Sequence, residues 1–372
     1  MLLPFLQNII IGSLLMLAFQ TYTNPRKVNT IANKWLSLLL FMAVILFISS
    51  SNIPFLSNLD NFVLFAIAPV LYLMTVNFVS PDRRFRPKEW GHFIPFLLFF
   101  PFAVFAFFQE FAHPPVSPPP HAASAEWVGI LLVFGLALQV STYLLLSYLK
   151  LRKHTKNITL FASSVEKIDL KWLQYLLLAI AAMLVIWLSD MLFDMNAFSN
   201  YSSICYFICI FIIAYFSHQQ GEIFPYSKKE IENIKEIIEE NAQPESTTKQ
   251  KRFSDEQLTT HKTLIIQLME IEKIYLDDEL SLPKLASLMS MSSNDLSYLI
   301  NEGFNENFFQ FVNKYRVEEA KKLLLSNKYA HLNILGLAFK SGFGSKSTFN
   351  ATFKKMTGQS PSEFQKAFVK DN

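Results

Sequence analysis

Long apolar runs separated by short polar segments fill the first 217 residues, and they limit the fold more than any other feature. A helix needs about 20 mostly apolar residues to cross the hydrocarbon core of a membrane. Seven runs approach that length, at residues 2–20, 35–53, 62–79, 93–108, 127–149, 172–193 and 204–216. With 51% apolar residues and 37 Phe, a soluble fold would struggle to cover so much apolar surface. We therefore predict a bundle of seven transmembrane helices.

Positive charge alternates between the loops that join these runs. Loops rich in Lys and Arg stay on the cytoplasmic side of a membrane. The second, fourth and sixth loops contain no Lys or Arg at all. The first, third and fifth loops carry the basic residues Arg26, Lys27, Lys34, Arg83, Arg84, Arg86, Lys88, Lys150, Arg152, Lys153, Lys156 and Lys167. We expect the amino terminus outside, the part after the seventh span in the cytoplasm, and a chain embedded in the lipid of a bacterial inner membrane.

The first run, residues 2–20, has no basic residue ahead of it and no clear cleavage site of small residues. A secretory signal peptide normally has both features. We therefore expect this run to remain as an uncleaved span.

Polar residues of the predicted outer loops allow two interpretations. They either form an acidic mouth that senses a cation, a peptide or a metal, or they cap helix ends, and we favour the caps. They are Asp60, Glu110, His113, His121, Glu126, Asp190 and Asp194. The two cysteines, Cys205 and Cys209, lie in an apolar run and predict core packing rather than a disulfide or a metal site. We predict no metal and no cofactor, and a signal that enters as an unidentified ligand at the outer face or within the bilayer.

Sequence motifs of the common enzyme classes are absent. The chain contains no phosphate-binding loop, no HExxH, no GxSxG, no histidine-kinase core and no receiver-type acidic cluster. It also shows no membrane-buried charge pair and no inverted repeat, which argues against a transporter. We predict that the protein is not an enzyme, and we assign no catalytic residue.

Three regions follow from the change in composition: a transmembrane domain at 1–217, a cytoplasmic connector at 218–253 and a C-terminal domain at 254–372. Within the connector, residues 227–240 predict an amphipathic helix with Ile231, Ile234 and Ile238 on one stripe. Residues 241–252 predict a flexible linker. The next helix should begin after the cap Ser254. Its apolar seam indicates either a homodimer or packing on the helices that follow, through Leu264, Leu268, Ile271 and Tyr275.

Residues 333–364, NILGLAFKSGFGSKSTFNATFKKMTGQSPSEF, predict two short helices joined by a tight turn. Leu335, Ala338 and Phe339 give the first helix an apolar face, and Gly342 supplies the turn. Ser345 should cap the second helix, and Gly358 and Pro361 should end it. Phe349 and Phe353 form its buried face, and its other face is small, polar and basic, with Ser347, Asn350, Ala351 and Lys354. A helix of this kind held by its neighbour is the geometry of a DNA-reading helix-turn-helix.

A similar pattern lies upstream. Residues 282–290 and 292–304 predict a first helix-turn-helix, with Leu285, Ala286, Leu288 and Met289 pointing inward and Asn294, Ser297, Tyr298 and Asn301 pointing outward. Residues 307–326 predict one long helix between the two units. About 20 residues rise about 30 Å, close to one DNA turn of about 34 Å. The spacer can therefore place two reading helices in successive major-groove segments.

The second unit closely resembles the second helix-turn-helix of AraC/XylS-type transcription regulators. The resemblance extends back to about Leu280 and lies in Ala338, Gly342, Phe343, Ser345, Phe349, Phe353, Lys354, Lys355, Thr357, Gly358, Ser360, Pro361 and Phe364. It implies base contacts from Asn294, Ser297, Tyr298, Lys346, Ser347, Asn350 and Ala351. Lys354 and Lys355, with Lys340, suit contacts with phosphate. Ala351 stands where the family often has arginine, and Thr348 where an aromatic residue is frequent, so the base preference of relatives does not transfer.

These observations predict an all-α, membrane-embedded, one-component transcription regulator that binds specific promoter DNA and acts with RNA polymerase. The alternative is a membrane receptor whose C-terminal helical domain binds a protein partner instead of double-stranded DNA.

Overall fold

The structure is a computed structural model that describes residues 2–24, 27–49, 59–80, 85–112, 123–193, 205, 208–209, 211–212, 215–217, 219–241, 251–329 and 331–370. Over these ranges the chain forms α-helices and short 3-10 helices without any strand, and one isolated antiparallel bridge joins Ala162 to Ser281. The predicted all-α class is confirmed.

The chain divides into two compact units. Unit 1 comprises Met1–Arg152 and Leu170–Ile223, and unit 2 comprises Lys153–Asp169 and Phe224–Asn372. The segment that joins the fifth and sixth predicted spans is therefore part of the unit that holds the C-terminal helices. The limits 1–217, 218–253 and 254–372 stay a prediction from composition.

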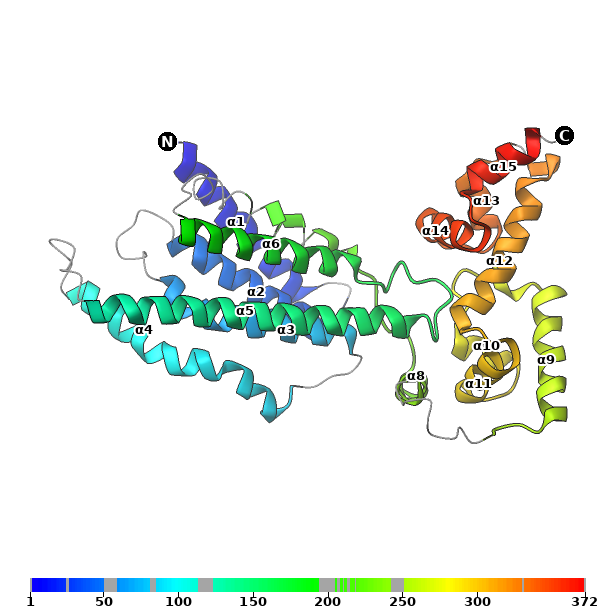
Figure 1. The fold of residues 1–372 in the computed structure, drawn as a ribbon, viewed down its shortest axis with the longest axis horizontal. Helices are drawn as coiled ribbons and strands as arrows, with labels where there is room; N and C mark the ends of the chain where they lie inside the picture. The colour runs from blue at the N-terminus through cyan, green and yellow to red at the C-terminus, as the bar shows by residue number, and fades with distance from the viewer. Residues whose placement is uncertain are drawn as a thin grey trace. The chain divides into compact units, whose positions relative to one another are not determined.

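Unit 1 contains the helices α1 (Leu2–Thr23), α2 (Thr30–Ser49), α3 (Leu64–Val79), α4 (Ile94–Ala112), α5 (Ala123–Ile158), whose end after Arg152 lies in unit 2, and α6 (Lys171–Phe193) (Figure 1). The short 3-10 helices η2 (Leu59–Phe62) and η3 (Pro87–Phe93) precede α3 and α4. Helix α3 is the core of the unit, because 11 of its 16 residues are buried. The side chain of Gln139 on α5 donates to the backbone oxygen of Phe65 on α3, at 3.0 Å.

Three described helical stretches are long and apolar enough to cross a membrane, not seven: Thr30–Ser49, Gly129–Ile158 and Lys171–Ser189. Helix α3 is apolar but has 16 residues, and at about 1.5 Å per residue it falls short of the hydrocarbon thickness of about 30 Å. The runs at 2–20 and 93–108 form helices α1 and α4, and the run at 204–216 is only partly described. The predicted count of seven spans is not confirmed.

Large apolar side chains cover the outer surface of α4 and α5. Phe102, Leu131 and Leu138 are each 70% exposed or more. Large apolar side chains exposed in such number are unusual on proteins that are surrounded by water.

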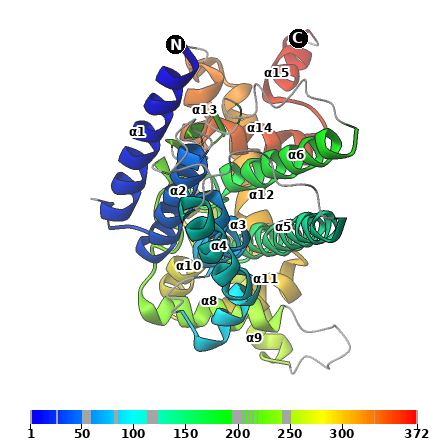
Figure 2. The same cartoon turned by 90° about the vertical axis from the view of Figure 1, so that its left-hand side faces the viewer.

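Unit 2 is built from α8 (Lys228–Glu240), α9 (Asp255–Glu270), α10 (Leu282–Leu288), α11 (Ser293–Phe304), α12 (Phe308–Leu324), α13 (Ile334–Lys340), α14 (Lys346–Thr357) and α15 (Pro361–Lys370) (Figures 1 and 2). Two 3-10 helices, η4 (Ile274–Leu276) and η5 (Asn327–Tyr329), lie between them. The predicted caps Ser254 and Ser345 are confirmed, because their side chains accept a backbone N–H of the first helical turn. Ser227, Ser292, Asn307 and Asn333 cap α8, α11, α12 and α13 in the same way.

Some predicted buried residues and helix ends differ from those in the structure by one or a few positions. The third buried isoleucine of α8 is Ile237 rather than Ile238, and α12 has 17 residues, hence about 26 Å. Leu288, Leu335 and Phe339 are 36% to 55% exposed, because the seven-residue helices α10 and α13 each bury only one narrow side.

The predicted seam of the helix after Ser254 is only partly buried: Leu268 and Tyr275 are buried, and Leu264 is 38% exposed. Helix α9 ends at Glu270 and buries Ile265, Leu268 and Met269, whereas Ile271 is 74% exposed. Whether this helix forms a homodimer stays a prediction.

Candidate nucleic-acid interface

The second helix-turn-helix consists of α13, a turn and α14. Phe349 and Phe353 of α14 are fully buried, and their rings contact each other and Phe343 of the turn. Their burial against Leu337, Ala338 and α12 fixes the orientation of α14. The opposite face of α14 is exposed, with Lys346, Ser347, Ala351, Lys354 and Lys355, and Asn350 is half-buried beside it.

Gly342 in the turn is required by two features of its surroundings. Its φ of +87° lies in the left-handed region, which a side chain at Cβ disfavours. A Cβ atom at this position would lie 2.3 Å from the backbone oxygen of Tyr275. The turn therefore approaches the segment before α10 so closely that only glycine can stand there.

Arg316 of α12 lies beside this turn and is completely buried. Its Nε donates to the backbone oxygen of Tyr275 at 2.8 Å, and Nη1 donates to the backbone oxygen of Ser163 at 3.1 Å. Nη2 donates to the Ser163 hydroxyl at 2.9 Å and to the backbone oxygen of Asp277 at 2.8 Å. One guanidinium thus joins α12, the segment before α10 and the loop after α5.

The charge of Arg316 persists despite its burial. Burial lowers the pKa of Arg316 to about 10, although the carboxylates of Asp278, Glu166 and Asp277 raise it. A pKa of about 10 leaves the guanidinium protonated near neutral pH. The phenyl ring of Phe343 lies 6.0 Å from its central carbon, which adds a cation–π contact.

The loop after α5, residues 159–166, packs into the same core. Its backbone oxygens at Thr159 and Phe161 accept the N–H groups of Phe309 and Leu282, at 3.1 and 2.9 Å. Its serines donate to the backbone oxygens of Leu280 and Asp278. This packing cannot be predicted from the sequence alone, because the loop and α12 are about 150 positions apart. The loop is a structural part of the helix-turn-helix domain.

The loop also reaches the first residue of the second reading helix. Ser345, the cap of α14, donates its hydroxyl proton to Oε1 of Glu166 at 2.7 Å. A carboxylate at a helix N-terminus is stabilised by the free N–H groups of the first turn. Residues connected directly to α5 and α6 therefore contact the start of α14.

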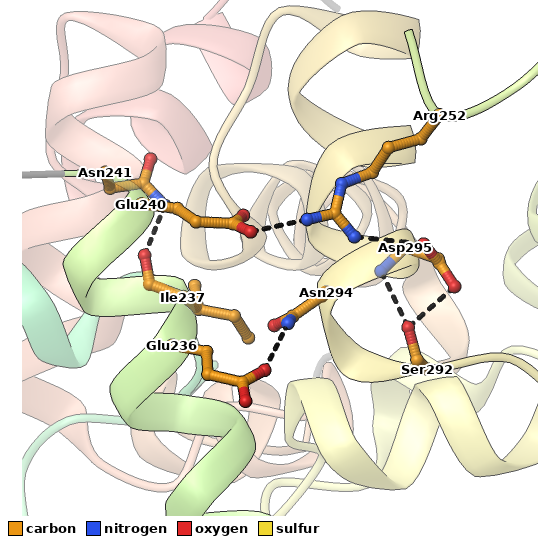
Figure 3. A network of polar contacts seen from close by, with 8 residues as sticks. All are labelled: Glu236, Ile237, Glu240, Asn241, Arg252, Ser292, Asn294 and Asp295. Carbon is orange, nitrogen blue, oxygen red and sulfur yellow. Dashed lines mark hydrogen bonds and ion pairs between the residues drawn. The ribbon is translucent and has the colours of Figure 1, made fainter. Parts of the chain in front are cut away.

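The first reading helix, α11, is covered on its polar face. Nδ2 of Asn294 donates to Oε2 of Glu236 on α8, at 2.7 Å (Figure 3). Arg252 bridges α8 and α11, with Nη2 at 2.5 Å from Glu240 and Nη1 at 3.2 Å from Asp295. The ring of Tyr298 packs edge-on against Phe253, with centroids 5.8 Å apart. Ser297 is half-buried on the same helix.

The predicted DNA contacts thus fall into two groups. Lys346, Ser347, Asn350, Ala351, Lys354 and Lys355 lie together on the accessible side of α14. On α11, Asn294 contacts α8, Tyr298 packs on Phe253, and Ser297 is half-buried. Their contact with bases or phosphates stays a prediction. Within the described residues, no three His, Cys, Asp or Glu side chains come close enough to hold a metal ion.

Three functional features were missed by sequence reasoning: the buried Arg316, the docked loop and the position of α8. Arg316 carried a signal, because it stands four residues from Val312 and from Ala320 on the buried stripe of α12. A lone arginine on an apolar stripe indicates a buried network. The loop and α8 gave no comparable signal, because their contacts join distant parts of the chain.

Residues 285–367 match the AraC-type family described as "Helix-turn-helix domain". Over 99 residues, 27% of this chain, the sequence is 30% identical to uncharacterized HTH-type transcriptional regulators of Staphylococcus aureus strains COL and N315. The match spans only 13% of the length of those proteins. The C-terminal domain of AraT, a response regulator from Geobacillus stearothermophilus, is 27% identical over 32% of this chain and 88% of that chain, with a TM-score of 0.26.

The C-terminal part of the chain is therefore a helix-turn-helix domain of the DNA-binding class. More particularly, it is an AraC-type domain homologous to those of HTH-type transcriptional regulators.

Proposed function

We propose that this protein is a membrane-embedded, one-component transcription regulator that binds promoter DNA through both helix-turn-helix units. The observation that carries the proposal is the exposed face of α14, which is held rigidly by buried phenylalanines within an AraC-type domain. Helix α14 contains three Lys and no acidic residue. Lysines on a protruding helix suit phosphate contacts, and the polar side chains between them suit base edges in the major groove.

The membrane assignment is supported by the three apolar helical stretches and by the exposed apolar surface of α4 and α5. The alternation of basic loops favours a seven-span bundle in the bacterial inner membrane, with the N-terminus outside and the DNA-binding domain in the cytoplasm. In this arrangement the membrane part senses a ligand at the outer face or within the bilayer, and the DNA-bound protein acts with RNA polymerase.

The path of the signal follows the covalent structure. Helix α5 ends at Ile158, and one residue later the chain enters the docked loop that contacts Arg316 and Ser345. A shift of α5 relative to α6 would pull directly on the cap of α14 and on the guanidinium between the two helix-turn-helix units. Such a loop is the differential contact that coupling between two sites requires.

The test uses the full chain in lipid nanodiscs and a pool of random duplexes of about 40 base pairs, which can hold two half-sites one helical turn apart. We expect selection of a defined sequence, and an affinity that falls by about 10³-fold or more between about 50 and 200 mM salt. Failure to retain any duplex at low salt would reject DNA binding and favour the protein-partner alternative. A reporter fused to the C-terminus tests the topology, because periplasmic activity would reject the proposed orientation.

A further inference from the structure

We propose that α8 is an autoinhibitory cap, which covers the reading helix of the first helix-turn-helix and must leave before α11 can enter DNA. The inference rests on the proposed function, because it assumes that α11 binds a major groove. It goes further, because it assigns a regulatory role to a segment that sequence alone marks only as a connector.

The major groove has no room for α8 beside α11. A helix with its side chains is about 10–12 Å across, and the major groove is about 12 Å wide, so the groove accepts one helix. Helix α8 contacts α11 along the face that carries Asn294. DNA and α8 therefore compete for the same face of α11.

Helix α8 is held by both apolar burial and polar contacts. Ile231, Ile234 and Ile237 of α8 are each at most 7% exposed, so an apolar stripe anchors the helix. Glu236 and Glu240 then make the two polar contacts with Asn294 and Arg252 (Figure 3). Glu236 accepts a hydrogen bond from the side-chain amide of Asn294, which the resemblance to AraC-type regulators assigns to base recognition.

The charge of α8 also opposes DNA at the first unit. Helix α8 contains five Glu and three Lys, and α11 contains Asp295 and Glu302 without any Lys or Arg. An acidic helix over the reading face repels phosphate, so DNA approaching the first unit meets negative charge while α8 is docked. Helix α14, with three Lys and no acidic residue, presents the opposite field.

The cap can also be displaced. Oδ1 of Asn294 is buried, and among the described residues it accepts no hydrogen bond. The Arg252 contacts are partly exposed, with 30% exposure of the arginine side chain, and such pairs contribute little. Base edges in DNA would offer Asn294 both a donor and an acceptor, which α8 does not.

The first test measures duplex binding by the full chain in nanodiscs. The probe is the duplex selected from the random pool. Glu236→Ala with Glu240→Ala removes both polar contacts of α8. We expect at least about tenfold tighter binding of the duplex, since the fraction of molecules in which α11 is uncovered rises. The matched control, Glu232→Ala with Glu239→Ala, makes the same charge change on exposed positions of the same helix. We expect the control to tighten binding clearly less than the Glu236 and Glu240 variant, because it changes only the charge of α8.

The outcomes separate the two proposals. If the parent binds and the two double variants tighten equally, only net charge matters and the cap is refuted. If the parent binds and neither variant tightens, the cap is also refuted, while DNA binding stands. If no variant binds any duplex, DNA binding fails and the cap fails with it.

A second measurement follows α8 itself. Ile234 is 1% exposed, so the thiol of Ile234→Cys should react slowly with a maleimide and much faster once the duplex is saturating. Glu232→Cys, at an exposed position, should react at one rate throughout, and the parent reports the background from Cys205 and Cys209. A thiol at position 234 that stays protected in the DNA complex would overturn the proposal.

Discussion

Replacing Arg316 with methionine tests whether one buried guanidinium holds the loop after α5 in the helix-turn-helix domain. Methionine keeps most of the side-chain volume but removes every donor. Four hydrogen bonds of 3.1 Å or less are then lost, to the backbone oxygens of Tyr275, Ser163 and Asp277 and to the hydroxyl of Ser163. The Ser163 backbone oxygen keeps its bond from Nδ2 of Asn313. At about 1 kcal/mol for each net hydrogen bond, the loss is about 4 kcal/mol.

One effect opposes this loss. Burial lowers the pKa of Arg316 to about 10, which shows that the folded domain is a poorer solvent for the charge than water is. Removing the charge relieves that cost. A buried acceptor left without a donor nevertheless costs about 1–3 kcal/mol, and the backbone oxygen of Tyr275 and the hydroxyl of Ser163 lose their donor here, so we expect a net loss of about 3 kcal/mol in local stability.

Hydrogen exchange on the full chain in nanodiscs provides the assay, because a two-unit protein has no single free energy of unfolding. The N–H groups of Leu282 and Phe309 donate to the loop and report its docking. A loss of about 3 kcal/mol corresponds to about a hundredfold faster exchange at both sites.

The control is Lys322→Met, which removes a cation from an exposed position of the same helix. It should leave both exchange rates unchanged. If Arg316→Met also leaves them within about threefold of the parent, a change worth well under 1 kcal/mol, the guanidinium does not hold the loop and the reasoning is refuted.

Three further predictions concern the second helix-turn-helix. Gly342→Ala should destabilise the domain by about 1–2 kcal/mol from its positive φ alone, with the overlap on Tyr275 adding to it. Hydrogen exchange at the N–H of Phe343 that matches the parent would contradict this. Lys354→Ala with Lys355→Ala should weaken binding to all duplexes alike and reduce the slope of log affinity against log salt by about 2; an unchanged slope would remove these lysines from the phosphate contacts. Asn350→Ala should relax the sequence preference at one base pair, which a repeated duplex selection measures. An unaltered consensus sequence would show that Asn350 does not contact a base.

Local sequence signals predicted the second helix-turn-helix well. A cap such as Ser345 and the i, i+4 pair Phe349 and Phe353 act within one or two turns, so their structural effect is visible in the sequence. The register of short or frayed helices was predicted less well. Helix α13 has seven residues, and a neighbour on one side decided that Leu337 is buried while Phe339 is exposed.

Long-range contacts could not be predicted in this way. Residues 159–166 were predicted only as part of a basic cytoplasmic loop. Nothing in the sequence of the loop indicates that Arg316 of α12 donates hydrogen bonds to the loop backbone. Helix α8 looked like a connector for the same reason. Its amphipathic pattern showed that it would bury Ile231 and Ile234, but not which helix would cover them. Amphipathicity predicts a buried face and leaves its partner open.

The two reading helices differ in a way that orders their engagement with DNA. Helix α14 is exposed and carries three Lys, so it can meet phosphate while the rest of the domain is unchanged. Helix α11 has no cation and is covered by α8, so it can follow only when α8 is displaced. Because DNA and α8 exclude each other, each weakens the other by the same factor. Under the two proposals, a signal that loosens α8 tightens DNA binding through the first unit alone, whereas a signal carried by the loop after α5 acts on the cap of α14. A duplex with a single half-site for α14 separates the two routes, because its affinity should respond only to a signal carried by the loop.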